Sequence, residues 1–142
     1  MSGASISPRR IELEALITVL VEEHAKMKER LGRIRETTAR RDFASASLAL
    51  KELESVFRQH ITDEEATVLR LLIDRMGVKG ASEEIKVFQQ HRPIYQLIQK
   101  VKELSALSAP ELEANQTRLA ALFDDHTLAE EQRVFPKAIR KS

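Results

Sequence analysis

Apolar residues recur in steps of four and three along the first third of the chain. This spacing is typical of a helix that packs in a bundle, so we expect one long helix over about residues 9–40. A single histidine, His24, stands in the middle of the stripe. The expected inward positions are Leu13, Ile17, Leu20, His24, Met27, Leu31 and Ile34.

A second stripe predicts a helix over about residues 43–76. Asp42 is a suitable N-cap and Gly77 a suitable C-terminal stop; Gly80 and Ser82 then form a turn, with Ser82 as the candidate cap of the next helix. The expected inward positions of this second helix are Ala46, Leu50, Leu53, Phe57, His60, Glu64, Val68 and Leu71.

A third helix is expected over about residues 83–105. Pro93 falls inside it, where a proline removes a backbone hydrogen bond and favours a kink. That kink either helps to orient His91, two residues earlier, or is simply tolerated. The expected inward positions are Ile85, Phe88, His91, Tyr95, Ile98 and Val101.

The fourth helix has a clear start signal. Ser108 and Glu111 form a capping box with a proline in the first turn, and the helix is expected to reach about Val134 before Pro136 ends or bends it. The expected inward positions are Leu112, Leu119, Leu122, His126 and Glu130.

Three short connections between four long helices predict an all-α, up-down-up-down four-helix bundle. We expect one domain over residues 9–142, preceded by a flexible N-terminal segment, residues 1–8.

Composition narrows the function classes. Apolar residues make up 42% of the chain and charged residues 32%, as in soluble globular proteins. The 23 basic and 22 acidic residues nearly cancel, so the chain has no strong positive electrostatic field that would attract nucleic acid or a membrane. No cysteine is present, which excludes disulfides and thiolate metal sites. Without a membrane span or signal-peptide core, we expect a cytoplasmic protein, either a monomer or a small homo-oligomer.

All four histidines of the chain lie on these inward stripes, and two of them begin the same motif. They stand 36, 31 and 35 residues apart, and His60 and His126 are each followed four residues later by a glutamate, Glu64 and Glu130. Residues four apart share one helix face, and buried carboxylates are costly without a cation or strong hydrogen bonds. We therefore expect a two-metal site. The alternative is a scaffold whose histidines are ordinary core residues.

The ligand types favour two iron ions, because imidazole and carboxylate suit iron, with zinc, copper and manganese as alternatives. If both glutamates bridge, each ion has about four protein ligands. The open positions suit an oxo or hydroxo bridge, dioxygen or nitric oxide.

These motifs resemble the hemerythrin-like, or HHE cation-binding, family. The resemblance covers about residues 10–140 and rests on His24, His60-Ile-Thr-Asp-Glu64, His91 and His126-Thr-Leu-Ala-Glu130, with Phe135-Pro136 after the last motif. It implies a four-helix bundle with a non-haem di-iron centre, in which Glu64 and Glu130 bridge. The implied metal ligands are His24, His60, Glu64, His91, His126 and Glu130.

One position departs from the oxygen-carrying hemerythrins, which have a fifth histidine four residues after the one on the third helix. Here that position is Tyr95. We expect Tyr95 to bind the iron as a phenolate, to hydrogen-bond to an iron-bound oxygen, or only to pack in the core. The four-histidine set also resembles the di-iron domain of iron–sulphur cluster repair proteins, but this sequence has no cysteine to match their cysteine-bearing N-terminal segment.

Three acidic residues next to inward positions, Glu23, Asp63 and Asp125, are candidate acceptors for a histidine N–H. Glu65 and Glu131 are expected at a helix flank or in solvent, because one residue turns about 100° round an α-helix.

The leading function is that of a di-iron protein that binds or senses dioxygen, nitric oxide or a related small ligand. The alternatives are a di-iron enzyme acting on peroxide or nitric oxide, and iron handling related to cluster repair.

Overall fold

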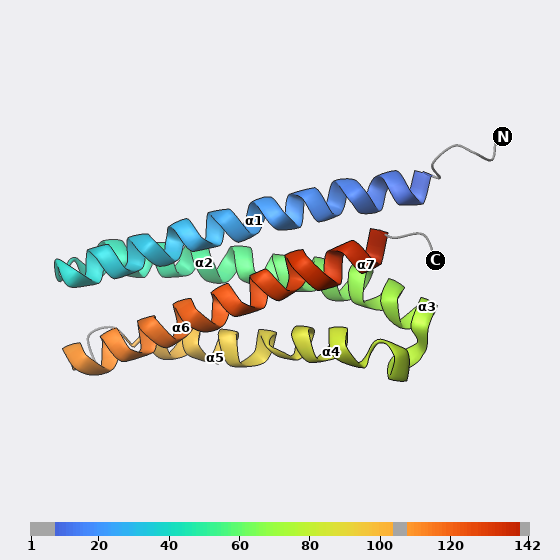
Figure 1. The fold of residues 1–142 in the computed structure, drawn as a ribbon. Helices are drawn as coiled ribbons and strands as arrows, with labels where there is room; N and C mark the ends of the chain where they lie inside the picture. The colour runs from blue at the N-terminus through green and yellow to red at the C-terminus, as the bar shows by residue number, and fades with distance from the viewer. Residues whose placement is uncertain (1–7, 104–107, 140–142) are drawn as a thin grey trace.

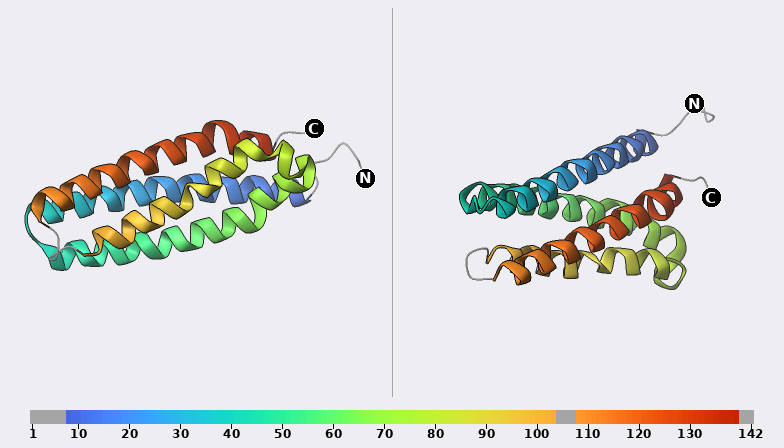
Figure 2. Two further views of the ribbon diagram at one scale, coloured as in Figure 1. Left: turned by 90° about the horizontal axis from the view of Figure 1, so that it is seen from below. Right: turned by 60° about the vertical axis from the view of Figure 1, so that its left-hand side comes forward.

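The computed structural model describes residues 8–103 and 108–139 as an antiparallel bundle of four long helices, three of which are interrupted (Figure 1). The all-α, up-down-up-down bundle predicted from the sequence is confirmed. Residues 1–7 of the expected flexible segment lie outside the described residues, and Pro8 already begins the first helix. Two further views in Figure 2 show the same four-helix arrangement, with α1 beside α2.

The first helix, α1 (Pro8–Ala39), is a single uninterrupted α-helix. Its predicted stripe is buried from Ile17 to Ile34, with His24 only 2% exposed. The chain then turns at Arg41, which has a positive φ of 60°, and α1 and α2 pack antiparallel along most of their length (Figure 1).

The second helix of the bundle has three parts: α2 (Phe43–Asp63), a π-helical turn η1 (Glu64–Leu69) and α3 (Arg70–Gly80). Asp42 caps α2 as predicted, since its side chain accepts a hydrogen bond from the backbone N–H of Ser45 at 3.2 Å. Gly77 adopts a positive φ of 73° within α3 and interrupts the helix there, at the predicted stop.

The third helix of the bundle is divided into α4 (Ser82–Gln89) and α5 (His91–Val101) by a turn at Gln90. The prediction of one helix over residues 83–105 was wrong in this respect, and its expected end lies outside the described residues. Pro93 becomes the third residue of α5, where the backbone N–H has no partner within the helix, so the proline is tolerated there. Ser82 begins α4 without a side-chain cap.

The fourth helix of the bundle comprises α6 (Ala109–Ala129), a second π-helical turn η2 (Glu130–Val134) and α7 (Phe135–Ile139). The predicted capping box is present: the Ser108 hydroxyl accepts from the N–H of Glu111, and the Glu111 carboxylate accepts from the N–H of Ser108. Helical structure continues through Pro136 to Ile139.

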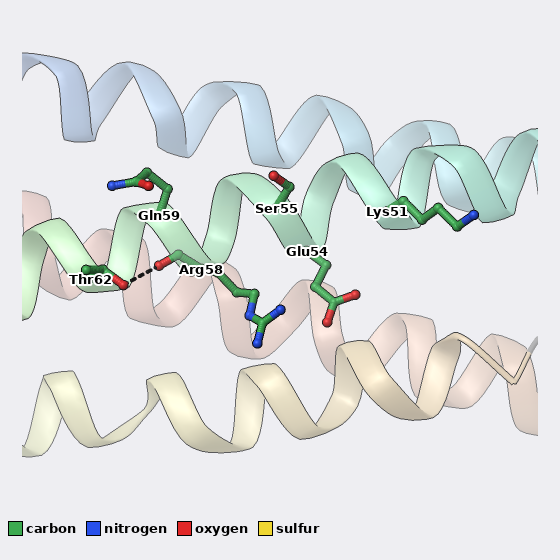
Figure 3. A pocket seen from close by; sticks show the side chains of 6 residues that line it. All are labelled: Lys51, Glu54, Ser55, Arg58, Gln59 and Thr62. Carbon is green, nitrogen blue, oxygen red and sulfur yellow. Dashed lines mark hydrogen bonds between the residues drawn. The ribbon is translucent and has the colours of Figure 1, made fainter.

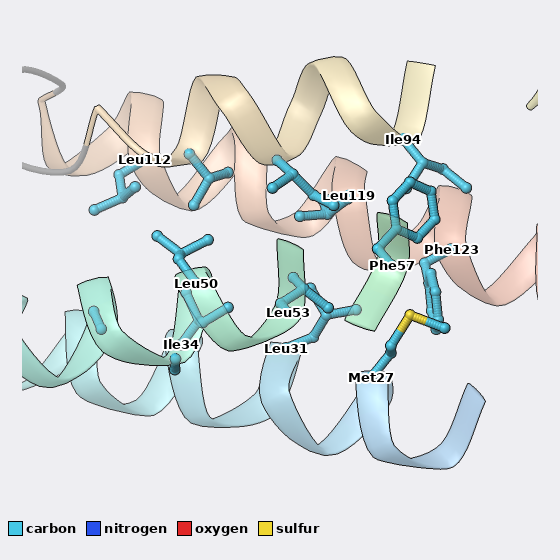
Figure 4. Close-up of a cluster of buried hydrophobic side chains, with 14 residues drawn as sticks. Met27, Leu31, Ile34, Leu50, Leu53, Phe57, Ile94, Leu112, Leu119 and Phe123 are labelled. Atoms are coloured by element: carbon cyan, nitrogen blue, oxygen red, sulfur yellow. The ribbon is translucent and has the colours of Figure 1, made fainter. Parts of the chain in front are cut away.

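Two apolar clusters fill the bundle, and the histidines lie between them. The first apolar cluster packs regular stretches of α1, α2, α5 and α6 (Figure 4). The second packs the first half of α1 against η1, α3, α4, η2 and α7. The first cluster consists of Met27, Leu31, Ile34, Ala46, Ala49, Leu50, Leu53, Phe57, Ile94, Ile98, Val101, Leu112, Leu119 and Phe123. The second consists of Ile17, Leu20, Val68, Leu72, Ala81, Val87, Phe88, Ala129, Val134, Phe135 and Ala138.

The buried stripe departs from the prediction at several positions, and Leu13 and Ile85, both expected inward, are only partly buried. Leu72 is buried in place of Leu71, because the π-helical turn η1 adds a residue before it. Ile94 is buried in place of Tyr95, because α5 restarts at His91 after the turn. On α6 the stripe passes through Gln116 and Phe123, and Leu122 is only partly buried.

Within the described ranges, no helix is both long and apolar enough to cross a membrane.

Candidate metal centre

The six predicted ligands come together in the middle of the bundle. The two glutamates that begin the π-helical turns are fully buried, Glu64 and Glu130 each at 0% exposure, and the four histidines are at most 4% exposed. All four long helices of the bundle contribute, as predicted from the stripes.

These residues form two groups, each able to hold one cation. One group is His24, His60, Glu64 and Glu130; the other is Glu64, His91, His126 and Glu130. Within each group the candidate ligand atoms all lie within 4.8 Å of one another. Both carboxylates belong to both groups, so the geometry is that of two adjacent positions bridged by two glutamates.

The inward nitrogen of each imidazole is Nε2, and each lies close to a carboxylate oxygen. His24 Nε2 is 2.9 Å from Glu130 Oε1, and His60 Nε2 is 2.9 Å from Glu64 Oε2. On the other side, His91 Nε2 is 2.9 Å from Glu64 Oε1, and His126 Nε2 is 3.2 Å from Glu130 Oε2.

The outward nitrogen of each imidazole, Nδ1, contacts a side-chain oxygen that we call its outer partner. The four contacts span 2.6 to 2.9 Å and are His24 with Glu131, His60 with Glu23, His91 with Glu65, and His126 with Gln90. Because these oxygens accept hydrogen bonds, each Nδ1 carries the proton, and the Nε2 lone pair of every neutral imidazole faces inward.

Four neutral imidazoles in this tautomer cannot donate to the carboxylates they face. Nitrogen and oxygen lone pairs 2.9 Å apart repel unless a cation or a proton lies between them. Among the described buried atoms without a hydrogen-bond partner are both Oε atoms of Glu64, Oε2 of Glu130, and Nε2 of His91 and of His126. The donor set and its orphaned atoms therefore fit two bound cations.

Without metal, protons take that place. Burial alone lowers the pKa of His60 and of His91, but hydrogen bonds and charge from Glu130 and Glu64 raise both pKa values to about 10. Burial raises the pKa of Glu130, yet the hydrogen bonds from the surrounding histidines hold it well below its ordinary value. The metal-free centre thus keeps the protonated imidazoles of His60 and His91 beside the ionised carboxylate of Glu130.

The prediction that Glu65 and Glu131 lie at a helix flank or in solvent is confirmed, since they are 48% and 38% exposed. Their contacts with histidines were not predicted, and the π-helical turns explain these contacts. Each turn begins at a bridging glutamate, and its wider winding reduces the angle between consecutive side chains. The second glutamate of each pair therefore reaches a histidine on a neighbouring helix, His91 or His24, although an α-helical period places it on the flank. The doubled glutamate after both HxxxE motifs was the sequence signal for this role.

The other outer partners were predicted in part. Glu23 accepts from His60 as expected for a candidate acceptor. Asp63 instead accepts from Gln59, and the side chain of Asp125 is exposed. Gln90 was missed, because its position next to His91 becomes informative only when the turn that separates α4 from α5 is known.

Phenylalanine rings pack against two of the four histidines, His24 and His91. Phe135 stacks on His24 with ring centroids 5.9 Å apart, and Phe123 meets the same imidazole edge-on at 6.4 Å. Phe88 and Phe57 pack edge-on against His91 at 5.4 and 6.1 Å. Apolar walls of this kind exclude water and strengthen the electrostatic interactions within the centre.

The Tyr95 hydroxyl does not face the metal centre, as the two iron-related roles expected for it required. Its hydroxyl donates to Glu54 at 3.3 Å, Arg58 lies 5.9 Å from the centre of its ring, and the ring packs against the first apolar cluster. Glu54 and Arg58 line a surface pocket on α2 (Figure 3). Of the three expected roles, packing is the one observed, because Ile94 takes the inward position of α5.

Comparison with known proteins gives one match. The family model of the hemerythrin HHE cation-binding domain matches residues 7–72, which include His24, His60 and Glu64. Neither curated proteins nor solved structures gave a significant match. The resemblance identified from the sequence is confirmed over residues 7–72, and the chain is an all-α, hemerythrin-like four-helix bundle.

Proposed function

We propose that the chain is a di-iron protein that binds or senses dioxygen, nitric oxide or a related small ligand at the centre described above. The observation that carries the proposal is the sharing of Glu64 and Glu130 between two four-residue ligand groups. Two shared carboxylates suit a pair of cations. A single ion would leave half of the buried imidazole nitrogens and carboxylate oxygens without a partner.

The residues hold the centre ready for its ions. Each ion would have two imidazole nitrogens and two carboxylate oxygens, and the outer partners keep every imidazole in the ligating tautomer. Two bound iron ions would supply Lewis acidity and one-electron redox chemistry. Four protein ligands leave positions open on each ion for a small exogenous ligand.

Burial favours a small ligand over a larger substrate. All six candidate ligands are at most 4% exposed, and four phenylalanines pack against His24 and His91. Binding is favoured over enzymatic turnover of peroxide or nitric oxide, because Tyr95, for which two of the three expected roles were at the iron, contacts Glu54 instead. The cytoplasmic location and the oligomeric state stay predictions.

The test is spectroscopic. Anaerobic protein loaded with ferrous iron should change its near-ultraviolet and visible absorption when dioxygen or nitric oxide is added, and Glu64→Ala should abolish the change. Glu54→Ala is the matched control, since Glu54 lies on the same helix but contacts Tyr95, Gln99 and Lys102. An unchanged spectrum from protein with two irons bound would overturn ligand binding. Catalytic loss of peroxide, faster than with free iron, would favour the enzyme.

A further inference from the structure

The two halves of the centre are built from corresponding parts. In each half, the residue directly before the first histidine contacts the second histidine: Glu23 contacts His60, and Gln90 contacts His126, both at 2.9 Å. The residue after each bridging glutamate, Glu65 or Glu131, contacts the first histidine of the opposite half.

The outer partners of the histidines differ in charge between the two halves. The His24 and His60 imidazoles donate to two carboxylates, Glu131 and Glu23, whereas His91 and His126 donate to one carboxylate, Glu65, and to the neutral amide of Gln90. The bridging glutamates serve both halves, so they do not compensate for this difference.

The charge that distinguishes the two halves is that of Glu23, which solvent screens less than the charges of Glu65 and Glu131. The carboxylates that correspond across the halves, Glu65 and Glu131, are 48% and 38% exposed. Glu23 is only 19% exposed, so its negative charge acts on His60 through a drier path than theirs. A carboxylate partner makes an imidazole a stronger ligand, and such partners typically change metal affinity by about 10- to 100-fold.

We propose that the two metal positions are inequivalent: the His24–His60 position binds a divalent cation first, and the His91–His126 position, weakened by Gln90, binds second and releases its ion first. This inference rests on the proposed function only in requiring that two ions bind. It assigns Glu23 and Gln90 as the positioning residues that set the order of loading and of release.

The test uses Zn²⁺, a redox-inert probe, added to metal-free protein while the ¹⁵N signals of the four histidines are followed by NMR. At one equivalent, the His24 and His60 signals should report about three to ten times the occupancy of the other pair, as expected for independent positions that differ about 10- to 100-fold in affinity. The second equivalent should then shift His91 and His126.

Near-isosteric exchanges provide the controls, since each keeps an acceptor for the histidine N–H. Gln90→Glu should raise the affinity of the His91–His126 position, so that both positions bind Zn²⁺ together. Glu23→Gln should give the same result by lowering the affinity of the His24–His60 position. The double exchange, Glu23→Gln with Gln90→Glu, should reverse the order.

Two ions binding with all four histidines shifting in parallel, or an order that survives the double exchange, would overturn the inference and leave the proposed function intact. No binding of Zn²⁺, and none of Fe²⁺ in a parallel anaerobic titration, would overturn both.

Discussion

The two apolar clusters on either side of the histidines are built differently. The first apolar cluster joins long, regular stretches of α1, α2, α5 and α6, and its seam largely follows the spacing of an ordinary helical bundle. The second packs α3, α4 and α7, which have 11, 8 and 5 residues, behind the two π-helical turns.

This difference indicates which part of the bundle depends on the centre. Helices of fewer than about 12 residues gain most of their stability from packing, and α3 and α7 follow the bridging glutamates directly through η1 and η2. We therefore expect the second apolar cluster to loosen when the ligands are not tied together, and the first to persist.

The largest effect is expected from Glu130→Ala, which removes a bridge shared by both metal positions. Metal content should fall from two ions to none, and amide hydrogen exchange should accelerate in α3, α4 and α7 more than around the first apolar cluster. Mass spectrometry of peptides after exchange measures this directly.

The neighbouring substitution Glu131→Ala is the matched control. It removes only the outer partner of His24, so two ions should still bind, with affinity reduced by about 10- to 100-fold. Equal acceleration of exchange around both clusters in Glu130→Ala would contradict the proposed dependence.

An intermediate effect is expected from pH on the metal-free protein. The folded-state pKa values of His60 and His91 are raised from 6.5 to about 10. The resulting stabilisation is complete below pH 6.5 and is lost as the pH rises through about 10. The melting temperature of metal-free protein should therefore fall over this range.

The metal-loaded protein should respond in the opposite sense at low pH, because protons compete with cations for the same Nε2 atoms. Calorimetry of both forms from pH 5 to 10.5 distinguishes them. A metal-free melting temperature that stays constant or rises between pH 6.5 and 10 would count against the protonated centre.

The smallest effect is expected from Tyr95→Phe, beside the first apolar cluster. It removes the hydroxyl contact with Glu54, which is worth about 0.5–1.5 kcal/mol at most. Metal content and the absorption spectrum should stay unchanged, and a changed iron spectrum would restore Tyr95 to the centre.

The difference between the regular and the interrupted helices also explains which features could be predicted from the sequence. The regular seam predicted the four-helix fold and placed His24, His60, His91 and His126 on inward faces, because an α-helical period holds along those stretches. The prediction of buried positions failed where the period changes, because Leu72 follows η1 and Ile94 follows the turn at Gln90. The histidine contacts of Glu65 and Glu131 were missed because both residues lie within π-helical turns, which depend on tertiary packing.

Anomalous X-ray diffraction at the iron edge, from crystals of iron-loaded protein, tests most directly whether two cations share Glu64 and Glu130. We predict two iron peaks, one beside His24 and His60 and one beside His91 and His126, with both carboxylates contacting both ions. A single peak, or two peaks with either carboxylate turned away, would contradict this sharing.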